Sequence, residues 1–257
     1  MRVAFVGKGG AGKSSLAGTF ARVLAAQASA TTGERVLALD SDPMPGMAFA
    51  LGVARSDAGL PDDAVEEYEQ LGRRQYRLRA GLTGPGAVEE YAVRGPDGVH
   101  FLQLGKARGP RWSNTRAHFA FQRVLDDLPG AGWSVVGDLP GGTRQPFFTW
   151  GRYAETFLVV VEPTPASVLT GRRLAKLASA GAAPRVVAVA NKVRERHDAE
   201  RVADRTGLTL LGAVPYDPAL SEADRLGLAV LDHDPDGATA TAVRSLVAAL
   251  HTEMEPT

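Results

Sequence analysis

The chain has 257 residues, of which 44% are hydrophobic and 23% charged, so its composition is that of a folded domain and not of a disordered segment. Its 29 basic and 29 acidic residues cancel, which excludes an overall field for nucleic acid or an anionic membrane and leaves only local patches. The absence of cysteine excludes disulfides, thiolate metal sites and cysteine nucleophiles.

The first predicted strand, Arg2–Val6, runs into glycines after one short apolar stretch. This stretch is far too short for the core of a signal peptide or for a membrane span, and no later segment reaches spanning length. We therefore expect a soluble, cytoplasmic protein without a membrane anchor.

Short apolar runs rich in Val, Leu and Ala alternate with helical patterns along the chain, as strand-helix alternation does. Most runs are continuous, so both faces of each strand should be buried, as in a parallel sheet. The patterns predict an α/β, three-layer fold with a mostly parallel central sheet of about seven strands and helices on both faces. The expected strands are Arg2–Val6, Arg35–Asp40, Val99–Leu104, Trp133–Asp138, Thr156–Val161, Arg185–Ala190 and Thr209–Val214. The expected helices are Lys13–Ala28, Thr115–Leu128, Pro165–Ala180, Asp198–Thr206, Pro218–Leu226 and Ala238–His251.

Residues 54–98 interrupt this alternation with a polar, glycine-rich and proline-rich stretch. We interpret them as an inserted, adaptable segment within a single domain that covers residues 1–257. A block of glutamates is followed there by a block of arginines, a pattern typical of a solvated helix face, with a docking surface for a partner as the alternative. The charged residues are Glu66, Glu67, Glu69, Arg73, Arg74, Arg77 and Arg79.

The segment between the first strand and the first helix reads Gly7-Lys8-Gly9-Gly10-Ala11-Gly12-Lys13-Ser14 and satisfies the phosphate-loop pattern G-x-x-x-x-G-K-[ST]. Its glycines let successive backbone N–H groups surround phosphate oxygens, and the helix start presents its positive end to them. Lys13 is expected to reach the β and γ phosphates and Ser14 to ligate Mg²⁺, which predicts a P-loop NTPase that uses ATP and magnesium. The residues of this loop expected to bind the nucleotide are Gly9, Gly10, Ala11, Gly12, Lys13, Ser14 and Ser15.

The same glycines, at positions 7, 9 and 12, also fit the dinucleotide fingerprint of an oxidoreductase. Two features argue against that alternative. The pair Lys13-Ser14 is what a triphosphate with magnesium requires, and the acidic residue that ends the second strand, Asp40, comes 28 positions after Gly12 instead of about 20.

Lys8 is unusual because a basic side chain inside the loop cannot easily fold back onto phosphates that its own backbone surrounds. The stretch from Lys8 to Ser15 resembles the deviant Walker A loop of the MinD/ParA and nitrogenase-iron-protein ATPases. In that family the extra lysine crosses a homodimer to touch the partner's nucleotide, so the resemblance implies a catalytic role in trans for Lys8, like that of an arginine finger. A solvated lysine is the alternative.

Carboxylates follow two of the predicted strands. The resemblance assigns orientation of the attacking water to Asp42, a third catalytic residue beside Lys8 and Lys13, and support of the magnesium shell to Asp40. Asp138, at the end of the strand Trp133–Asp138, fits the Walker B role of binding magnesium or its water. The glycines at 141 and 142 allow the large changes of φ and ψ that a γ-phosphate switch needs.

Two later strand ends are expected to complete the pocket. In the resembling ATPases the equivalent asparagine and Pro-x-Asp stretch border the adenine. The resemblance therefore implies nucleotide contacts for Asn191, Lys192, Pro215 and Asp217. Each of these signals is weak alone, because Asn-Lys and Pro-x-Asp are also common turn sequences.

Within this family the segments 89–91, 97–106 and 216–227 resemble the CooC-type nickel-insertion ATPases of carbon monoxide dehydrogenase. That branch binds metal through a Cys-x-Cys pair across its dimer, whereas this sequence has no cysteine there, so soft-metal binding by that route is impossible. Arg111 and Trp112 occupy the place of the pair. They are candidates for a dimer or client contact, with core packing of Trp112 as the alternative.

The resemblance implies an ATP-hydrolysing switch whose homodimer closes on ATP and acts on an unidentified client protein in a CooC-like maturation or chaperone role. The alternative is a MinD/ParA-like spatial-positioning or DNA-partitioning ATPase. The tail Ser245–Thr257 has no lysine or arginine, which disfavours membrane recruitment, and DNA binding would need a basic surface. A third interpretation is a ligase or small-molecule kinase on the same fold. The candidates for the basic surface are Arg172, Arg173, Lys176 and Arg185.

Overall fold

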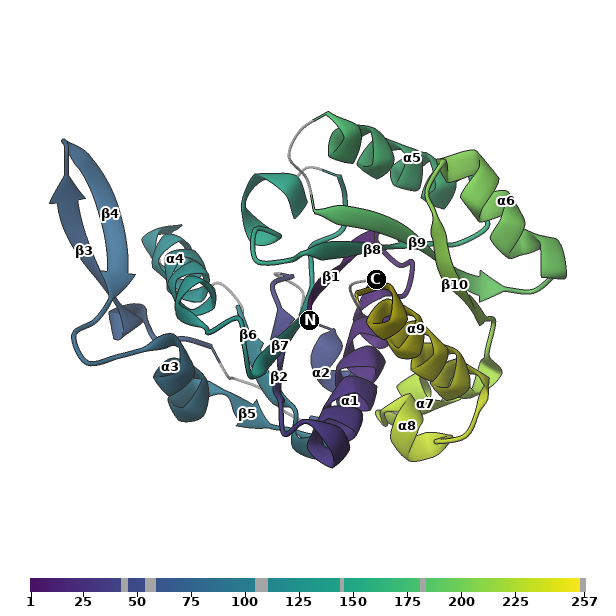
Figure 1. The fold of residues 1–257 in the computed structure, drawn as a ribbon, viewed down its shortest axis with the longest axis horizontal. Helices are drawn as coiled ribbons and strands as arrows, with labels where there is room; N and C mark the ends of the chain where they lie inside the picture. The colour runs from purple at the N-terminus through teal and green to yellow at the C-terminus, as the bar shows by residue number, and fades with distance from the viewer. Residues whose placement is uncertain (43–45, 54–58, 105–110, 144–145, 181–183, 255–257) are drawn as a thin grey trace.

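The computed structural model describes residues 1–42, 46–53, 59–104, 111–143, 146–180 and 184–254 (Figure 1). In these residues an eight-stranded sheet has the strand order β10-β9-β8-β1-β7-β2-β6-β5, and seven of its strands run parallel. The short edge strand β5 is antiparallel to β6. The predicted mostly parallel, three-layer fold is therefore confirmed. The strands are β1 (Arg2–Gly7), β2 (Arg35–Asp40), β5 (Val93–Arg94), β6 (His100–Gln103), β7 (Trp133–Asp138), β8 (Thr156–Val161), β9 (Arg185–Val193) and β10 (Leu210–Pro215).

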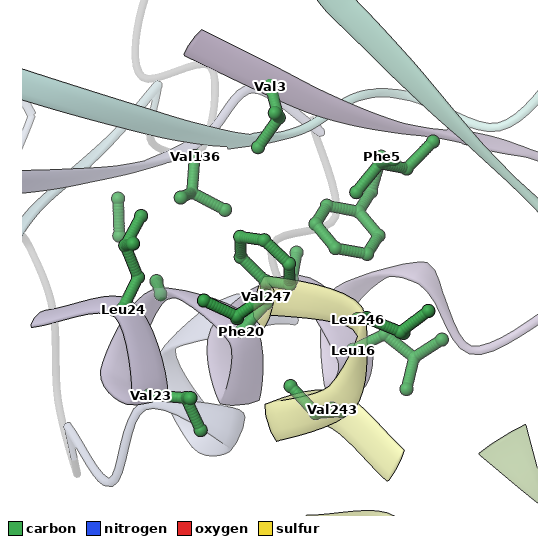
Figure 2. Close-up of a cluster of buried hydrophobic side chains, with 14 of the residues drawn as sticks. Val3, Phe5, Leu16, Phe20, Val23, Leu24, Val136, Val243, Leu246 and Val247 are labelled. Atoms are coloured by element: carbon green, nitrogen blue, oxygen red, sulfur yellow. The ribbon is translucent and has the colours of Figure 1, made fainter. Parts of the chain in front are cut away.

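The two faces of the sheet are covered by different helices because alternate side chains of a strand point to opposite faces. On β1, Val3 and Phe5 face one helical layer, and Ala4 and Val6 face the other. Figure 2 shows Val3 and Phe5 directed toward the helices of the first layer. The first layer contains α1 (Lys13–Thr31) and α9 (Ala238–Met254), and the second contains α4 (Arg111–Asp127), α5 (Pro165–Ser179) and α6 (Arg196–Thr206).

Helix α1 is the element that joins the phosphate loop to the core. Phe20 is fully buried on it and meets Phe5 edge-on, with 5.5 Å between ring centroids. A phenylalanine buried to this degree stabilises the fold by about 1.5–3 kcal/mol. The helix runs three residues beyond the predicted Ala28 and ends where Gly33, at φ 68°, donates its N–H to the carbonyl of Ala28.

The charged segment is a β-hairpin and not a helix, so the predicted solvated helix face is wrong. Strands β3 (Val65–Gln70) and β4 (Arg73–Leu78) pair antiparallel and stand beyond α4 at the left of Figure 1. Arg74 Nε lies 2.8 Å from Glu67 Oε1, so the acidic strand faces the basic one, and Tyr76 stacks on Phe119 of α4. The reversal of charge along the sequence is the pairing of two neighbouring strands. Helix α3 (Gly84–Tyr91) follows the hairpin.

The hairpin turn contains a leucine in an unfavourable backbone conformation. Leu71 has φ 52° with 97% of its surface exposed, and Gly72 follows at φ 70°. A turn with both central residues at positive φ favours Asn-Gly, and a branched side chain there is strained. We expect Leu71→Asn to stabilise the hairpin by about 0.5–1 kcal/mol, measured as slower amide hydrogen exchange in β3 and β4. Leu71→Ala is the control, and equal exchange in the two variants would contradict the turn argument.

Candidate functional site

The phosphate loop connects β1 to α1 at the carboxyl end of the parallel sheet, where open α/β folds bind ligands. Its path requires glycine at two positions. A Cβ on Gly7, at φ 146°, would lie 2.5 Å from the carbonyl oxygen of Val160. A Cβ on Gly12, at φ 92°, would lie 2.4 Å from Nδ2 of Asn191. The loop is further closed by a bond from the Ala11 N–H to the Lys8 carbonyl at 3.2 Å.

A cleft of about 370 Å³ lies against this loop, and the two lysines of the loop take different positions relative to it. Lys13 is 6% exposed and lines the cleft together with Ser14 and Ser15. Lys8 is outside the described cleft lining, and its Nζ donates to the carbonyl of Gly9 at 3.3 Å on the exposed side of the loop. The structure therefore separates a lysine that faces the cleft from one that does not.

Two predicted metal-binding carboxylates come together beside the loop. Asp40 and Asp138 are register partners at the ends of the neighbouring strands β2 and β7, and both are fully buried. Burial, together with the nearby charge of Asp40, raises the pKa of Asp138 to about 7 although Ser14 donates a hydrogen bond to it. Burial also raises the pKa of Asp40. The pair is thus a site of concentrated negative charge that favours a cation.

The donor atoms present fit magnesium bound together with a nucleotide. Ser14 Oγ lies 2.5 Å from Asp138 Oδ2, and the buried Asp138 Oδ1 has no hydrogen-bond partner in the described residues. Among these residues no group of three or more His, Asp or Glu side chains could hold a metal by itself. Magnesium is usually held by one or two carboxylates with water and substrate phosphates, so this donor set suits it once phosphate oxygens are added.

Asp40 also accepts hydrogen bonds from backbone N–H groups of described residues that follow β2. Its Oδ1 accepts the N–H of Asp42 at 3.1 Å, and its Oδ2 accepts the N–H groups of Gly46 at 2.9 Å and Met47 at 3.0 Å. These bonds hold the half-buried Asp42 next to the carboxylate pair. They give Asp40 a positioning role beside the predicted support of the magnesium shell.

The loop after β7 lies directly on the phosphate loop. Gly142 donates its N–H to the Gly7 carbonyl at 3.1 Å, forming an isolated antiparallel bridge. A Cβ on Gly141 would lie 3.1 Å from the Gly9 nitrogen and 3.7 Å from Lys13 Nζ. These glycines therefore lie close to the position of a γ-phosphate bound by Lys13. Their action as a switch stays a prediction.

The residues at the end of β9 meet the phosphate loop. Asn191 is buried, and its Nδ2 donates to the carbonyl of Ala11 at 2.8 Å. Lys192 Nζ donates to the carbonyl of Gly10 at 3.1 Å and lies 2.5 Å from Glu162 Oε1. Both residues line the cleft. Their predicted contact with the base stays a prediction, while the structure adds contacts with the loop itself.

Asp217 and Pro215, unlike Asn191 and Lys192, have no described contact with the phosphate loop. Asp217 caps α7 (Pro218–Leu226) by accepting the Ala219 N–H, and its other oxygen accepts the N–H and the hydroxyl of Thr239. Its burial raises the pKa, but the bonds from Thr239 and Ala219 outweigh this and lower it. Neither Asp217 nor Pro215 belongs to the described cleft lining. We infer a structural role for this carboxylate, and its predicted place beside the base stays a prediction.

Part of the cleft wall comes from residues that the sequence did not predict. Leu220, Ser221 and Asp224 of α7 line it, as does Phe49 of the short helix α2 (Met47–Ala50). The pattern Asp217-Pro218 indicates a helix start, but it does not show which face of that helix meets the phosphate loop. The side chains of Arg111 and Trp112 lie outside the described part of the chain, and their interface role stays a prediction.

No helix in the described part of the chain has both the length and the apolarity that a bilayer crossing requires.

Comparison with known proteins identifies the family. The family model of the CobQ/CobB/MinD/ParA nucleotide binding domain matches residues 3–231. The carbon monoxide dehydrogenase accessory protein CooC of Rhodospirillum rubrum is 28% identical, over all of this chain and 98% of that protein. An uncharacterized ATP-binding protein of Methanocaldococcus jannaschii is 27% identical over 88% of this chain and 90% of its own. The septum site-determining protein MinD of Pyrococcus horikoshii, solved with Mg-ADP, superimposes with a TM-score of 0.72 at 18% identity, covering 99% and 97% of the two chains.

Proposed function

Since this chain belongs to the CobQ/CobB/MinD/ParA nucleotide-binding family and is a magnesium-dependent P-loop ATPase, we propose that ATP closes a homodimer of it, which acts on a client protein in a CooC-like maturation role. ATP hydrolysis then opens the dimer and releases the client. We place this cycle in the cytoplasm, where ATP is supplied.

The observation that carries the dimer proposal is the position of Lys8. A side chain at this position cannot easily fold back onto phosphates that its own backbone surrounds, and Lys8 lies outside the described cleft lining whereas Lys13 lies in it. A charge held at the exposed side of the loop can act on the phosphates of a second copy, as an arginine finger does. The site would then be complete only in the dimer.

The other roles follow from the arrangement within one subunit. Lys13, which lines the cleft, neutralises the charge of the β and γ phosphates. Asp42, whose N–H is held by Asp40 outside the described cleft lining, orients the attacking water. Ser14 and Asp138 would hold magnesium, which supplies charge neutralisation between the phosphates when bound. Product analysis with labelled γ-phosphate distinguishes this hydrolysis from a kinase, because a kinase leaves the label on an acceptor and hydrolysis leaves it in free phosphate. A ligase also releases free phosphate, but it does so only when its two substrates are present, whereas hydrolysis needs only ATP, magnesium and water.

Asp42→Ala is expected to trap the ATP-bound dimer. Without an oriented water the bound ATP persists, so the closed state accumulates. Light scattering should give the mass of a dimer with Mg-ATP and of a monomer with Mg-ADP. A mass that stays monomeric with Mg-ATP, in a variant shown by calorimetry to bind ATP, would overturn the dimer proposal.

The client role rests on the similarity to the Rhodospirillum rubrum accessory protein, which extends over the whole chain. The absence of cysteine means that this chain does not carry a soft metal on thiolates, so the role proposed for it is a nucleotide-driven action on the client. The assay uses a metal-depleted carbon monoxide dehydrogenase with nickel salt. Activation that requires both this chain and ATP hydrolysis supports the role, and activation indifferent to either contradicts it.

A DNA-partitioning switch is the second candidate, favoured by one surface. Arg172, Arg173 and Lys176 are exposed on α5 and together present three positive charges on that helix. Arg185, the fourth candidate for the basic surface, forms an ion pair with Glu253, so its charge is already compensated. ATP-dependent, salt-sensitive retention on nonspecific duplex DNA would favour this candidate over the client role.

A further inference from the structure

Lys192 and Glu162 form an ion pair beside the phosphate loop, at the wall of the cleft that Lys192 helps to line. Strand β9 carries the two consecutive residues Asn191 and Lys192, and they hold two consecutive carbonyls of the loop. Asn191 donates to the carbonyl of Ala11, and Lys192 donates to the carbonyl of Gly10. In a regular strand consecutive side chains point to opposite faces, so both could not reach the same loop.

An irregularity in β9 makes the double contact possible. In the pairing with β10, Asn191 faces Val214 and Val193 faces Pro215, so Lys192 is an extra, unpaired residue. Lys192 is also one of three non-glycine residues with positive φ in the described chain, at 57°. An extra residue of this kind turns the strand and re-aims a side chain, and it is common beside active sites. Here the ammonium group of Lys192 is directed toward the Gly10 carbonyl.

The ammonium group is held from a third direction. Lys192 Nζ lies 2.5 Å from Glu162 Oε1 at the end of β8, and that carboxylate is 17% exposed. The Glu162 backbone N–H is in turn bound by Ser167 Oγ at 3.0 Å, and Ser167 is buried. Two neighbouring strand ends thus converge on one carbonyl of the loop through a partly buried ion pair.

This arrangement acts on the direction of the backbone donors. In a trans peptide the C=O and the N–H point to opposite sides. A carbonyl of Ala11 drawn toward Asn191 therefore fixes the N–H of Gly12 on the other side. The Gly10–Ala11 peptide is held at both ends, because its carbonyl meets Lys192 and its N–H meets the Lys8 carbonyl. A loop with so many glycines would otherwise lose considerable conformational entropy on binding phosphate.

We propose that Lys192 and Glu162 are positioning residues of the nucleotide site: the ion pair holds Gly10 and pre-organises the phosphate loop, and Lys192 does not touch the nucleotide. This inference rests on the proposed nucleotide site and deepens it. It differs from a direct contact in one decisive respect. If Lys192 bound the nucleotide directly, removal of the Glu162 charge would free its ammonium group and leave affinity unchanged or tighter.

The test measures the affinity for Mg-ADP by calorimetry in Glu162→Gln, Lys192→Gly and the double variant. Glycine relieves the positive φ of Lys192, so Lys192→Gly should keep or raise the melting temperature while removing the contact. We expect about tenfold weaker binding in Lys192→Gly and several-fold weaker binding in Glu162→Gln, because one hydrogen bond to a charged group is lost or loosened. The double variant should bind no more weakly than Lys192→Gly, since both changes break one device.

Two further measurements distinguish a residue that positions the phosphate loop from one that only stabilises the fold. In steady-state hydrolysis the KM for ATP should rise while kcat changes little, because a pre-organised loop helps ground state and transition state alike. Lys192→Arg should recover part of the affinity. Wild-type affinity in Lys192→Gly, or unchanged or tighter binding in Glu162→Gln, overturns the inference. A wild-type chain that binds no Mg-ADP would instead overturn the proposed nucleotide site, so the two failures are distinguishable.

Discussion

Replacing Lys8 by alanine is expected to lower the rate of ATP hydrolysis by about 10³-fold, in the range of a lost arginine finger. The affinity for ATP should change little, because Lys8 lies outside the described lining of the cleft in its own subunit. The loop itself should keep its shape, since the only bond of the side chain in the described residues is to the neighbouring Gly9 carbonyl. Single-turnover hydrolysis and calorimetric ATP binding are the two measurements.

A mixture of two inactive variants tests whether Lys8 works across the dimer. In a mixed dimer of Lys8→Ala and Asp42→Ala, the site of the Lys8→Ala subunit keeps its own Asp42 and receives Lys8 from the other subunit. Random pairing makes half of the dimers mixed with one working site each, so an equal mixture should recover about a quarter of the wild-type rate if the lysine acts in trans. A mixture that stays as slow as its components would show that Lys8 acts within its own subunit.

Asp138→Asn is expected to make the protein more stable and far less active. The buried carboxylate faces Asp40 without a cation, so the amide removes a charge that the fold disfavours. Without magnesium at pH 8, the free energy of unfolding should rise by on the order of 2 to 4 kcal/mol, because the pKa of Asp138 moves from 3.8 to about 7 on folding. The rate of hydrolysis should fall by about 10²–10³-fold, since a ligand of magnesium is lost.

The pH dependence of this gain has a definite sign. A carboxyl whose pKa is raised in the folded state contributes stability below its unfolded pKa, and that contribution is lost as the pH rises through the folded value. The free energy of unfolding of the wild type should therefore drop below that of Asp138→Asn as the pH rises from about 4 to about 7. Above pH 7 the difference between the two should stay constant. Urea unfolding at pH 5 and pH 8 measures the difference. An equal gap at the two pH values would contradict the buried-charge account.

Magnesium with ADP should reverse the order at pH 8. The cation compensates the charge of Asp138 in the wild type and has no such partner in the variant, so the stabilisation by Mg-ADP should be larger in the wild type.

Sequence alone determined the phosphate loop, the order of the seven parallel strands along the chain and the acidic ends of β2 and β7. These signals are local: a glycine pattern between strand and helix, continuous apolar runs, and carboxylates directly after them. Family resemblance added the roles proposed for Lys8 and Asp42, which local chemistry does not give and which stay predictions.

Tertiary structure decided what depends on contacts between distant segments. The glutamate and arginine blocks pair across a hairpin because residues 66 and 77 become register partners, which helical periodicity could not show. Asp217 accepts two hydrogen bonds from Thr239, 22 residues away, and the N–H of Ala219, so the structure shows this carboxylate as a helix cap, while its predicted place beside the base stays a prediction. The unpaired residue in β9 turns Lys192 toward Gly10, 182 residues earlier, and only the pairing of β9 with β10 creates that turn. The sequence thus determined which residues carry charge at the site, and packing determined which of them face the cleft.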